Sequence, residues 1–379
     1  MNSDPPYFDY AATSPVLPEV AEIVLFHLTE EFGNAGSRTH ALGTRAKKAL
    51  EEARGFVAQV VDANPIEVLF TSGATESNNL AILGLASAGL SSGRKHIVTT
   101  AIEHKAVLEP IDELRKRGFE VDVVGCDPTG RISAESILEL VRSDTLLVSV
   151  MHVNNETGIK QPIAEIAEQL GNDVYFHVDG AQGFGKDLET LQNQRIDLIS
   201  VSGHKIYGPK GVGALVARRR GINPIPLTPL MFGGGQEQGL RPGTLAVPLI
   251  AGLGIAAKLA LSEHSLRQDT VNRIENQVVE MVERCGGVIN GDRLYGLPYI
   301  LSASITGLDS EAFMVAAKDV IALSNGAACA SSTYTTSHVL EAMGLSEDRL
   351  RYTVRISWSH LSGPPPTDDL VKIVNNSRW

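Results

Sequence analysis

The sequence predicts an α/β fold built on a largely parallel sheet. Short runs rich in β-branched residues recur through the first two thirds of the 379-residue chain. Several are apolar at nearly every position, as in strands buried on both faces. Helical stretches separate many of them, and this alternation is typical of a parallel sheet. The expected strands are Val68–Ser72, His96–Thr100, Val121–Val124, Thr145–Val150, Val174–Val178, Leu198–Val201 and Gly213–Ala217. The helical stretches include Ala106–Arg117, Ala134–Val141 and Ile163–Leu170.

The pattern changes after about residue 258. A long amphipathic helix is expected first, and shorter strands and helices follow it. These elements are Leu266–Arg284, Ser302–Thr306, Glu311–Lys318, Tyr352–Ser357 and, after the Gly363–Pro366 break, Asp368–Asn375. We therefore expect a large domain over residues 14–258 and a smaller α+β domain made of residues 1–13 and 259–379.

Composition narrows the class of protein. Hydrophobic residues make up 43% of the chain and charged residues 20%, and the formal net charge is -11. An acidic chain lacks the clustered Lys and Arg that grip nucleic acid. Three cysteines offer neither a disulfide framework nor a paired metal-binding spacing. No signal-peptide pattern and no apolar run of about 20 residues is present. We expect a cytoplasmic protein with no direct contact with nucleic acid or membrane.

Chemically useful residues follow the predicted strands. At Ala74 and Thr75 a glycine turn leads into a helix, whose N-terminus suits a phosphate; an ordinary capped helix start is the alternative. Asp179 ends a buried strand and needs a partner, which a protonated pyridine nitrogen, a salt bridge or a helix cap would provide. Lys205 follows another strand and is either a surface lysine or a Schiff-base amine. A phosphate cup, a pyridinium partner and a lysine together are what pyridoxal phosphate (PLP) requires.

The motifs that contain these residues resemble those of a known family. They are Tyr7–Thr13, Phe70–Asn79, Glu103–Ala106, His152–Gly158, His177–Gln182, Ser202–Lys205 and Gly233–Thr244. The chain resembles the cysteine desulfurases of the class V aminotransferase group, which are fold-type I PLP enzymes, over nearly its whole length. The resemblance implies a large domain with a mainly parallel seven-stranded sheet and an obligate homodimer.

The resemblance also implies roles for individual residues. Lys205 would carry PLP, His104 would stack on its ring and move protons, and Arg355 would bind the substrate carboxylate. The remaining cofactor contacts would come from Ala74, Thr75, Asn155, Asp179, Gln182, Ser202, His204 and, in the neighbouring subunit, Thr244. Asn155 is also expected to contact the substrate. Lys205, His104 and Cys329 are thus the expected catalytic residues.

Cys329 is the residue that distinguishes sulfur extraction from other PLP reactions. It lies among small residues, ahead of a polar stretch, which favours an exposed thiolate. A buried structural cysteine is the alternative, and the apolar run Val320–Leu323 just before it keeps that alternative open. The segment resembles the catalytic loop of desulfurases that serve sulfur-accepting proteins. We therefore expect L-cysteine to be converted to L-alanine, with its sulfur passing to Cys329 as a persulfide and then to an acceptor protein. Cys126 and Cys285 are interpreted as structural.

The sequence says less about which protein receives the sulfur. Asn34–His40 departs from the usual family motif and, with Ala-Ala-Cys at residues 327–329, resembles desulfurases for DNA phosphorothioate modification. Iron–sulfur assembly and tRNA thiolation are the other candidate destinations. The alternative activities are another class V PLP enzyme, such as an aminotransferase or selenocysteine lyase, and a non-catalytic scaffold.

Overall fold

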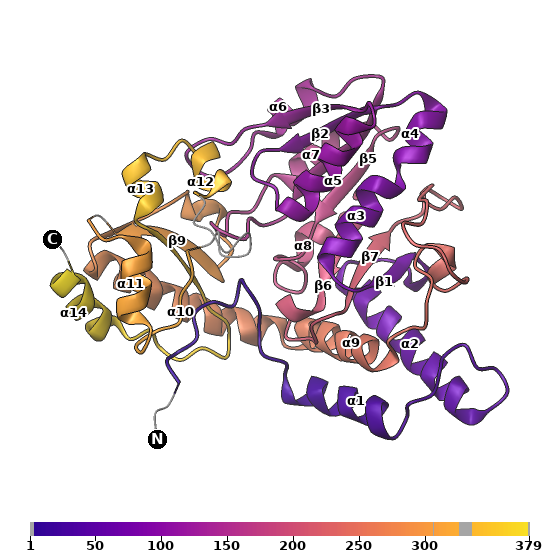
Figure 1. Cartoon of the computed structure of the whole chain (residues 1–379), viewed down its shortest axis with the longest axis horizontal. Coiled ribbons are helices and arrows are strands. Elements are labelled where there is room, and N and C mark those ends of the chain that lie inside the picture. Colours follow the sequence, from indigo (N-terminus) through magenta and orange to yellow (C-terminus); the bar gives the residue numbers. More distant parts are fainter. Residues whose placement is uncertain (1–3, 306, 326–335, 378–379) are drawn as a thin grey trace.

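The computed structural model describes residues 4–305, 307–325 and 336–377, and Cys329 lies outside them. The expected strands form one seven-stranded sheet with the order β1-β7-β6-β5-β4-β2-β3 (Figure 1). Its strands are β1 Val68–Thr71, β2 His96–Thr100, β3 Glu120–Val124, β4 Thr145–Met151, β5 Tyr175–Asp179, β6 Leu198–Ser202 and β7 Gly213–Ala217. Strands β3, β2, β4, β5 and β6 are parallel, and β7 pairs antiparallel with β6 and β1. The prediction of a mainly parallel sheet is confirmed.

Helices cover both faces of this sheet. Side chains alternate along each strand, so Leu69 faces one layer of helices while Val68 and Phe70 face the other. The first layer contains α3 Ala74–Gly84, α4 Ala86–Ser92 and α5 Lys105–Lys116. The second contains α1 Pro18–Thr29, α2 Ala41–Val60, α6 Ala134–Glu139, α7 Ile163–Gln169, α8 Leu188–Leu191 and α9 Val247–Ser262.

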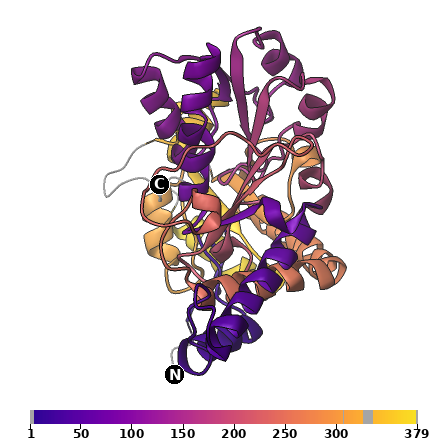
Figure 2. The same ribbon diagram turned by 90° about the vertical axis from the view of Figure 1, so that its right-hand side faces the viewer.

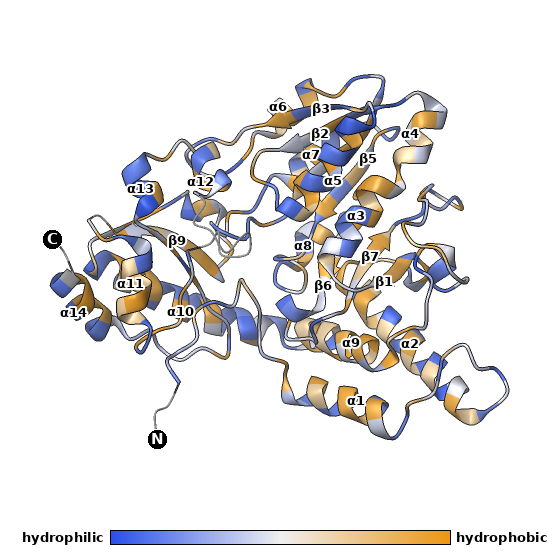
Figure 3. Ribbon diagram, viewed as in Figure 1, coloured by the Kyte–Doolittle hydropathy of each residue, from blue (hydrophilic) through white to orange (hydrophobic). Residues whose placement is uncertain are grey.

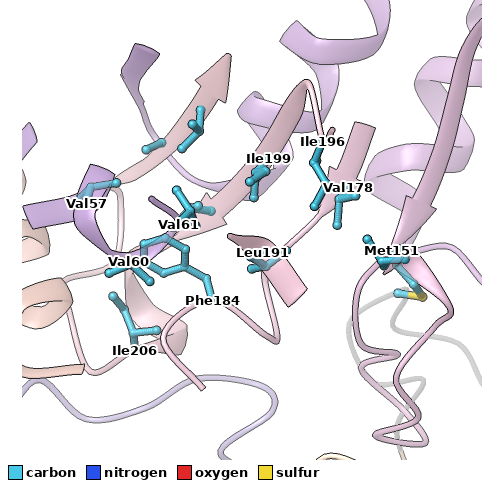
Figure 4. Close-up of a cluster of buried hydrophobic side chains, with 14 of the residues drawn as sticks. Val57, Val60, Val61, Met151, Val178, Phe184, Leu191, Ile196, Ile199 and Ile206 are labelled. Carbon is cyan, nitrogen blue, oxygen red and sulfur yellow. The ribbon is translucent and has the colours of Figure 1, made fainter. Parts of the chain in front are cut away.

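The second layer closes the main hydrophobic core. Figure 4 shows residues at the end of α2, such as Val57 and Val60, near Phe184 and Ile206 from the loops beyond β5 and β6. Phe184 is 1% exposed and Val57 is fully buried. Because these loops are held by the core, the residues beside them, Gln182 and Lys205, are carried on rigid backbone.

A second, smaller sheet has its own core. Strands β8 Gly287–Ile289, β9 Ile300–Ile305 and β10 Thr353–Ser357 form an antiparallel sheet in the order β10-β9-β8. Helices α10 His264–Arg284, α11 Ser310–Ala317 and α14 Thr367–Ser377 pack into this core. The short helix α13 Glu347–Arg351 lies next to β9, whereas α12 His338–Ala342 buries Val339 and Leu340 in the core of the large sheet. Figure 1 shows this unit beside the large sheet, with α9 and α10 connecting the two, and in the turned view of Figure 2 it lies behind the large sheet.

The N-terminal segment runs between the two sheets (Figure 1). Phe8 is buried in the core of the small sheet, whereas Tyr10 belongs to the core of the large one. The amide of Phe8 donates to the carbonyl of Ala322, and Asp9 forms a β-bridge with Ser357. The proposed domain boundary after residue 258 falls inside α9, and the division into two domains stays a prediction.

Among the described residues, no single helix has the length and apolar character needed to cross a bilayer. Helices α9 and α10 satisfy that requirement only when taken together, and they are bent by 75°. The apolar residues of α9, such as Leu253 and Ala257, pack into the large core.

Candidate active site

A cavity of about 550 Å³ lies at the carboxyl ends of the parallel strands, where ligands bind in such sheets. Ten of the residues that the sequence predicts for the site line it: Ala74, Thr75, His104, Asn155, Asp179, Gln182, Ser202, His204, Lys205 and Arg355. Thr244 does not line this cavity and is exposed. Cys329 lies outside the described residues, so the structure gives no position for it.

The turn between β1 and α3 forms one wall. Gly73 has φ of +154°, a conformation that side-chain-bearing residues rarely adopt, and α3 begins at the next residue, Ala74. Gly213 of β7 lets this turn lie directly on the sheet, because a Cβ there would come within 2.6 Å of the Gly73 Cα. The first N–H groups of α3 therefore meet the cavity, and with Thr75 and Ser202 they suit an anion.

Asp179 is the last residue of β5 and is 5% exposed. Its Oδ2 accepts a hydrogen bond of 2.8 Å from Asn78 Nδ2, and its Oδ1 accepts one of 3.0 Å from the amide of Ala181. These two donors fix the plane of the carboxylate beside the cavity. Asn78 is buried on α3, and its role was missed by the sequence analysis although it lies inside the recognised Phe70–Asn79 motif.

His104 is the N-cap of α5. Its Nδ1 accepts a hydrogen bond of 3.1 Å from the amide of Ala106. Burial lowers the pKa of His104, so the ring is neutral at pH 7. Because Nδ1 is the acceptor, the neutral ring carries its proton on Nε2. His104 therefore offers a hydrogen-bond donor to the cavity.

Lys205 lies in the short 3₁₀ helix Gly203–Lys205 that follows β6. Its Nζ donates to the carbonyl oxygen of Ala12 at 2.9 Å and to that of Ala11. The neighbouring His204 ring contacts Thr13 Oγ1 at 3.1 Å through Nδ1. Burial, with nearby lysines, lowers the pKa of His204 to about 4, so its ring is neutral. The N-terminal segment thus supplies the acceptors that hold the lysine.

Arg355 of β10 closes the opposite wall and is 2% exposed. Its Nη1 donates to the carbonyl of Asn155 at 3.0 Å, and its Nη2 forms an ion pair of 2.7 Å with Asp9 Oδ1. Its Nε is buried and has no hydrogen-bond acceptor within the described ranges. Because Arg355 lines the cavity and each Nη carries a second hydrogen, the arginine can bind an anion there. Asp9 was not predicted, although it lies in the Tyr7–Thr13 motif.

The chain matches known proteins over almost its entire length. A family model described as aminotransferase class-V matches residues 6–362. The cysteine desulfurase IscS of Rickettsia africae is 41% identical over 373 residues, which are 98% of this chain and 90% of the relative. The mitochondrial cysteine desulfurase of Saccharomyces cerevisiae is 41% identical over 374 residues, 98% of this chain and 74% of the relative.

Solved structures agree with these matches. DndA from Streptomyces lividans has a TM-score of 0.82 and 51% identity, covering 92% of this chain and 98% of its own. SspA in complex with cysteine has a TM-score of 0.82 and 37% identity, covering 94% of this chain and 100% of its own. Together with the fold and the cavity, these matches confirm the expected family. The chain belongs to the aminotransferase class-V family and, within it, to the cysteine desulfurases.

Proposed function

We propose that this cysteine desulfurase binds PLP through Lys205, converts L-cysteine to L-alanine, and delivers the sulfur as a persulfide on Cys329 to an acceptor protein. The observation that carries the proposal is the convergence of Lys205, Asp179, His104 and the N-terminus of α3 on one cavity. Each of these groups has a counterpart on PLP: the aldehyde, the ring nitrogen, the ring face and the phosphate.

The residues present fit that cofactor. The α3 N-terminus accepts a phosphate without a positively charged side chain, because its amide groups are unpaired. Asp179 is held by two donors and remains available to a pyridinium nitrogen. Gln182 Oε1 and Asn78 Oδ1 are buried atoms of cavity-lining residues, and they have no hydrogen-bond partner within the described part of the chain. A polar ligand in the cavity would satisfy such atoms.

When bound, PLP supplies an aldehyde that condenses with amines and a ring that accepts electrons from the substrate α-carbon. Lys205 would hold the cofactor through its amine, and the same amine would take the α-proton of the substrate. The carbonyl oxygens of Ala11 and Ala12 are placed to accept hydrogen bonds from the resulting ammonium. His104 presents its Nε2–H to the cavity, and Arg355 binds the substrate carboxylate as a bidentate pair.

Cys329 completes the reaction. Its thiolate attacks the substrate sulfur, the carbon–sulfur bond breaks, and the electron pair returns to the substrate carbon, which is protonated to give L-alanine. The sulfur stays on Cys329 as a persulfide. Cys126 is unsuited to this step, because burial raises the pKa of its thiol to about 11, and Cys285 is 4% exposed.

The test is to reconstitute the protein with PLP and measure its visible absorbance and its production of L-alanine from L-cysteine. Lys205→Ala is expected to lose the absorbance of the lysine-bound cofactor. Cys329→Ser is expected to keep that absorbance but lose persulfide formation, whereas the matched control Cys126→Ala keeps both. A colourless wild-type protein, or normal persulfide transfer by Cys329→Ser, would refute the proposal.

We also propose a homodimer. Large apolar side chains are exposed along α1 and the segment that follows it, where Figure 3 shows apolar residues at the margin of the molecule. Ile222 and Phe232 are each 87% exposed on the segment that leads to Thr244. Exposed apolar surface of this kind marks an interaction site, and Thr244 lies apart from the cavity of its own chain. Light scattering should give twice the 40.5 kDa chain mass, and Phe232→Asp should lower it.

The acceptor of the sulfur is proposed from the degree of similarity. Identity is 51% to DndA and 41% to the IscS relative. This difference favours an acceptor that works in DNA phosphorothioate modification over an iron–sulfur assembly protein. The variant motif at Asn34–His40 points to the same acceptor. Co-purification of the persulfide acceptor from the source cells, with the neighbouring genes as a guide, tests this choice.

A further inference from the structure

Arg355 is held on both sides of its guanidinium by groups that the reaction does not consume. The Asn155 carbonyl accepts from Nη1 at 3.0 Å, and Asp9 Oδ1 accepts from Nη2 at 2.7 Å. The side chain is 2% exposed, so no bulk water competes for these donors. The Nε group remains without an acceptor within the described ranges. The Asp9 side chain and the Asn155 carbonyl therefore determine which N–H groups of Arg355 face the cavity.

Asp9 is itself fixed. Its Oδ1 also accepts a hydrogen bond of 3.0 Å from Ser324 Oγ. Its backbone lies beside β10: the amide of Ser357 donates to the Phe8 carbonyl at 2.8 Å, and the amide of Tyr10 donates to the Ser357 carbonyl at 3.3 Å. The carboxylate of Asp9 therefore reaches Arg355 from a backbone that is hydrogen-bonded to the strand bearing that arginine.

A guanidinium recognises a carboxylate only in a limited orientation. Its five N–H groups form a planar fork, and a bidentate pair requires two of them to point at the ligand together. An arginine free to rotate would meet the substrate in several geometries, and small misplacements weaken recognition strongly. The Asp9 carboxylate also balances the charge of this buried guanidinium before substrate binds.

We propose that Asp9 is a positioning residue that orients Arg355 for the α-carboxylate of the amino-acid substrate. Asp9 acts through the arginine and does not itself bind the reacting atoms. The inference rests on the proposed function, in which Arg355 receives that carboxylate. It predicts that replacing Asp9 weakens the binding of ligands that carry a carboxylate and leaves the binding of ligands without one unchanged.

The experiment compares two probes on the PLP-loaded enzyme. L-Alanine keeps the α-amino and α-carboxylate groups, whereas cysteamine has the amine and thiol but no carboxylate. Each is titrated against the visible spectrum of the cofactor to give a Kd, and KM and kcat are measured for L-cysteine. Asp9→Ala should raise the Kd for L-alanine and the KM for L-cysteine at least about tenfold, as expected for a lost charge-assisted hydrogen bond. The Kd for cysteamine should stay within about twofold, and kcat should change less than KM.

Asp9→Asn is the conservative variant. Its amide oxygen still accepts from Arg355 and Ser324, so L-alanine binding should return to within about threefold of wild type. Asp9→Glu keeps the charge but moves the carboxylate by one methylene, and it should weaken L-alanine binding as Asp9→Ala does. Because Asp9→Glu and Asp9→Asn separate geometry from charge, they decide the question even where Asp9→Ala does not fold.

Three outcomes would overturn the proposal. One is an unchanged Kd for L-alanine in Asp9→Ala or Asp9→Glu. Another is an equal loss of L-alanine and cysteamine binding, which would indicate general damage to the site. The third is an Arg355→Lys variant that binds L-alanine normally. A wild-type holoenzyme that responds to neither L-alanine nor L-cysteine would instead refute the proposed function, and this inference would fall with it.

Discussion

The raised pKa of Glu103, next to His104, provides a test of the electrostatics of the candidate active site. The side chain is fully buried next to His104, and its Oε1 accepts hydrogen bonds from Thr100 Oγ1 at 2.7 Å and from the Met151 amide at 2.8 Å. Burial, and to a lesser extent the Asp179 carboxylate, raises the pKa of Glu103 to about 8 against those two hydrogen bonds. At neutral pH the folded protein therefore holds Glu103 protonated.

The consequence for stability follows from linkage. Between pH 4.5 and 8 the folded state keeps a proton that the unfolded state releases, so the wild-type free energy of unfolding falls as pH rises. The slope is at most about 1.4 kcal/mol per pH unit, and the loss between pH 5 and pH 7 is about 2.5 kcal/mol, because the unfolded state is still partly protonated at pH 5. Glu103→Gln mimics the neutral acid and lacks this contribution. Its stability relative to wild type should therefore improve by about that amount from pH 5 to pH 7.

Urea unfolding of both holoenzymes at half-unit pH intervals measures this difference. Subtracting one protein from the other at each pH cancels the groups that titrate alike in both. Infrared spectroscopy gives an independent reading, because Glu103→Gln should remove the carbonyl band of one protonated carboxylic acid at pH 7. A stability difference that does not vary between pH 5 and pH 7, with no band lost, would show that Glu103 is ionised and that the reasoning is wrong.

Two further substitutions test a buried ion pair of the large domain and the turn beside the cavity. Glu237→Ala leaves the buried Arg54 without the carboxylate that it meets at 2.7 Å. The free energy of unfolding, measured in urea, should therefore fall by about 3–5 kcal/mol. A loss below about 1 kcal/mol would contradict a buried ion pair. Gly213→Ala places a Cβ against the Val201 carbonyl of β6 and 2.6 Å from the Gly73 Cα. It should therefore displace the α3 turn and raise the Kd for PLP at least about tenfold. Gly55→Ala, whose Cβ meets nothing within 4 Å, is the matched control and should leave PLP affinity unchanged.

The large sheet was predictable because most of its strands are short and buried on both faces. The runs ending at Asp179 and at Ser202 are buried and mostly apolar, and each expected strand matches an observed one to within one or two residues. Since parallel strands present their carboxyl ends at one edge, the polar residues that follow them could be expected to meet. Asp179 and Lys205 do line the same cavity.

The helices were predicted less completely. Helix α9, Val247–Ser262, was not expected, because it is apolar on nearly every face and gives no amphipathic periodicity. Helices α1 and α2 and the short strand β8 were also absent from the prediction. In the site, Asn78 and Glu103 lay inside recognised motifs, but a motif does not show which of its members contact one another.

Asp9 shows the limit of local patterns most clearly. It is separated from Arg355 by 346 positions, and nothing in the spacing of either motif links them. The link comes from the path of the N-terminal segment, which Phe8 anchors in the small core and Tyr10 in the large one. Asp9, between these anchors, forms the ion pair with Arg355. The carbonyl of Ala11, just after the second anchor, accepts a hydrogen bond from Lys205. The segment therefore links the Arg355 side of the cavity to the Lys205 side, and a change in its path would move both side chains together.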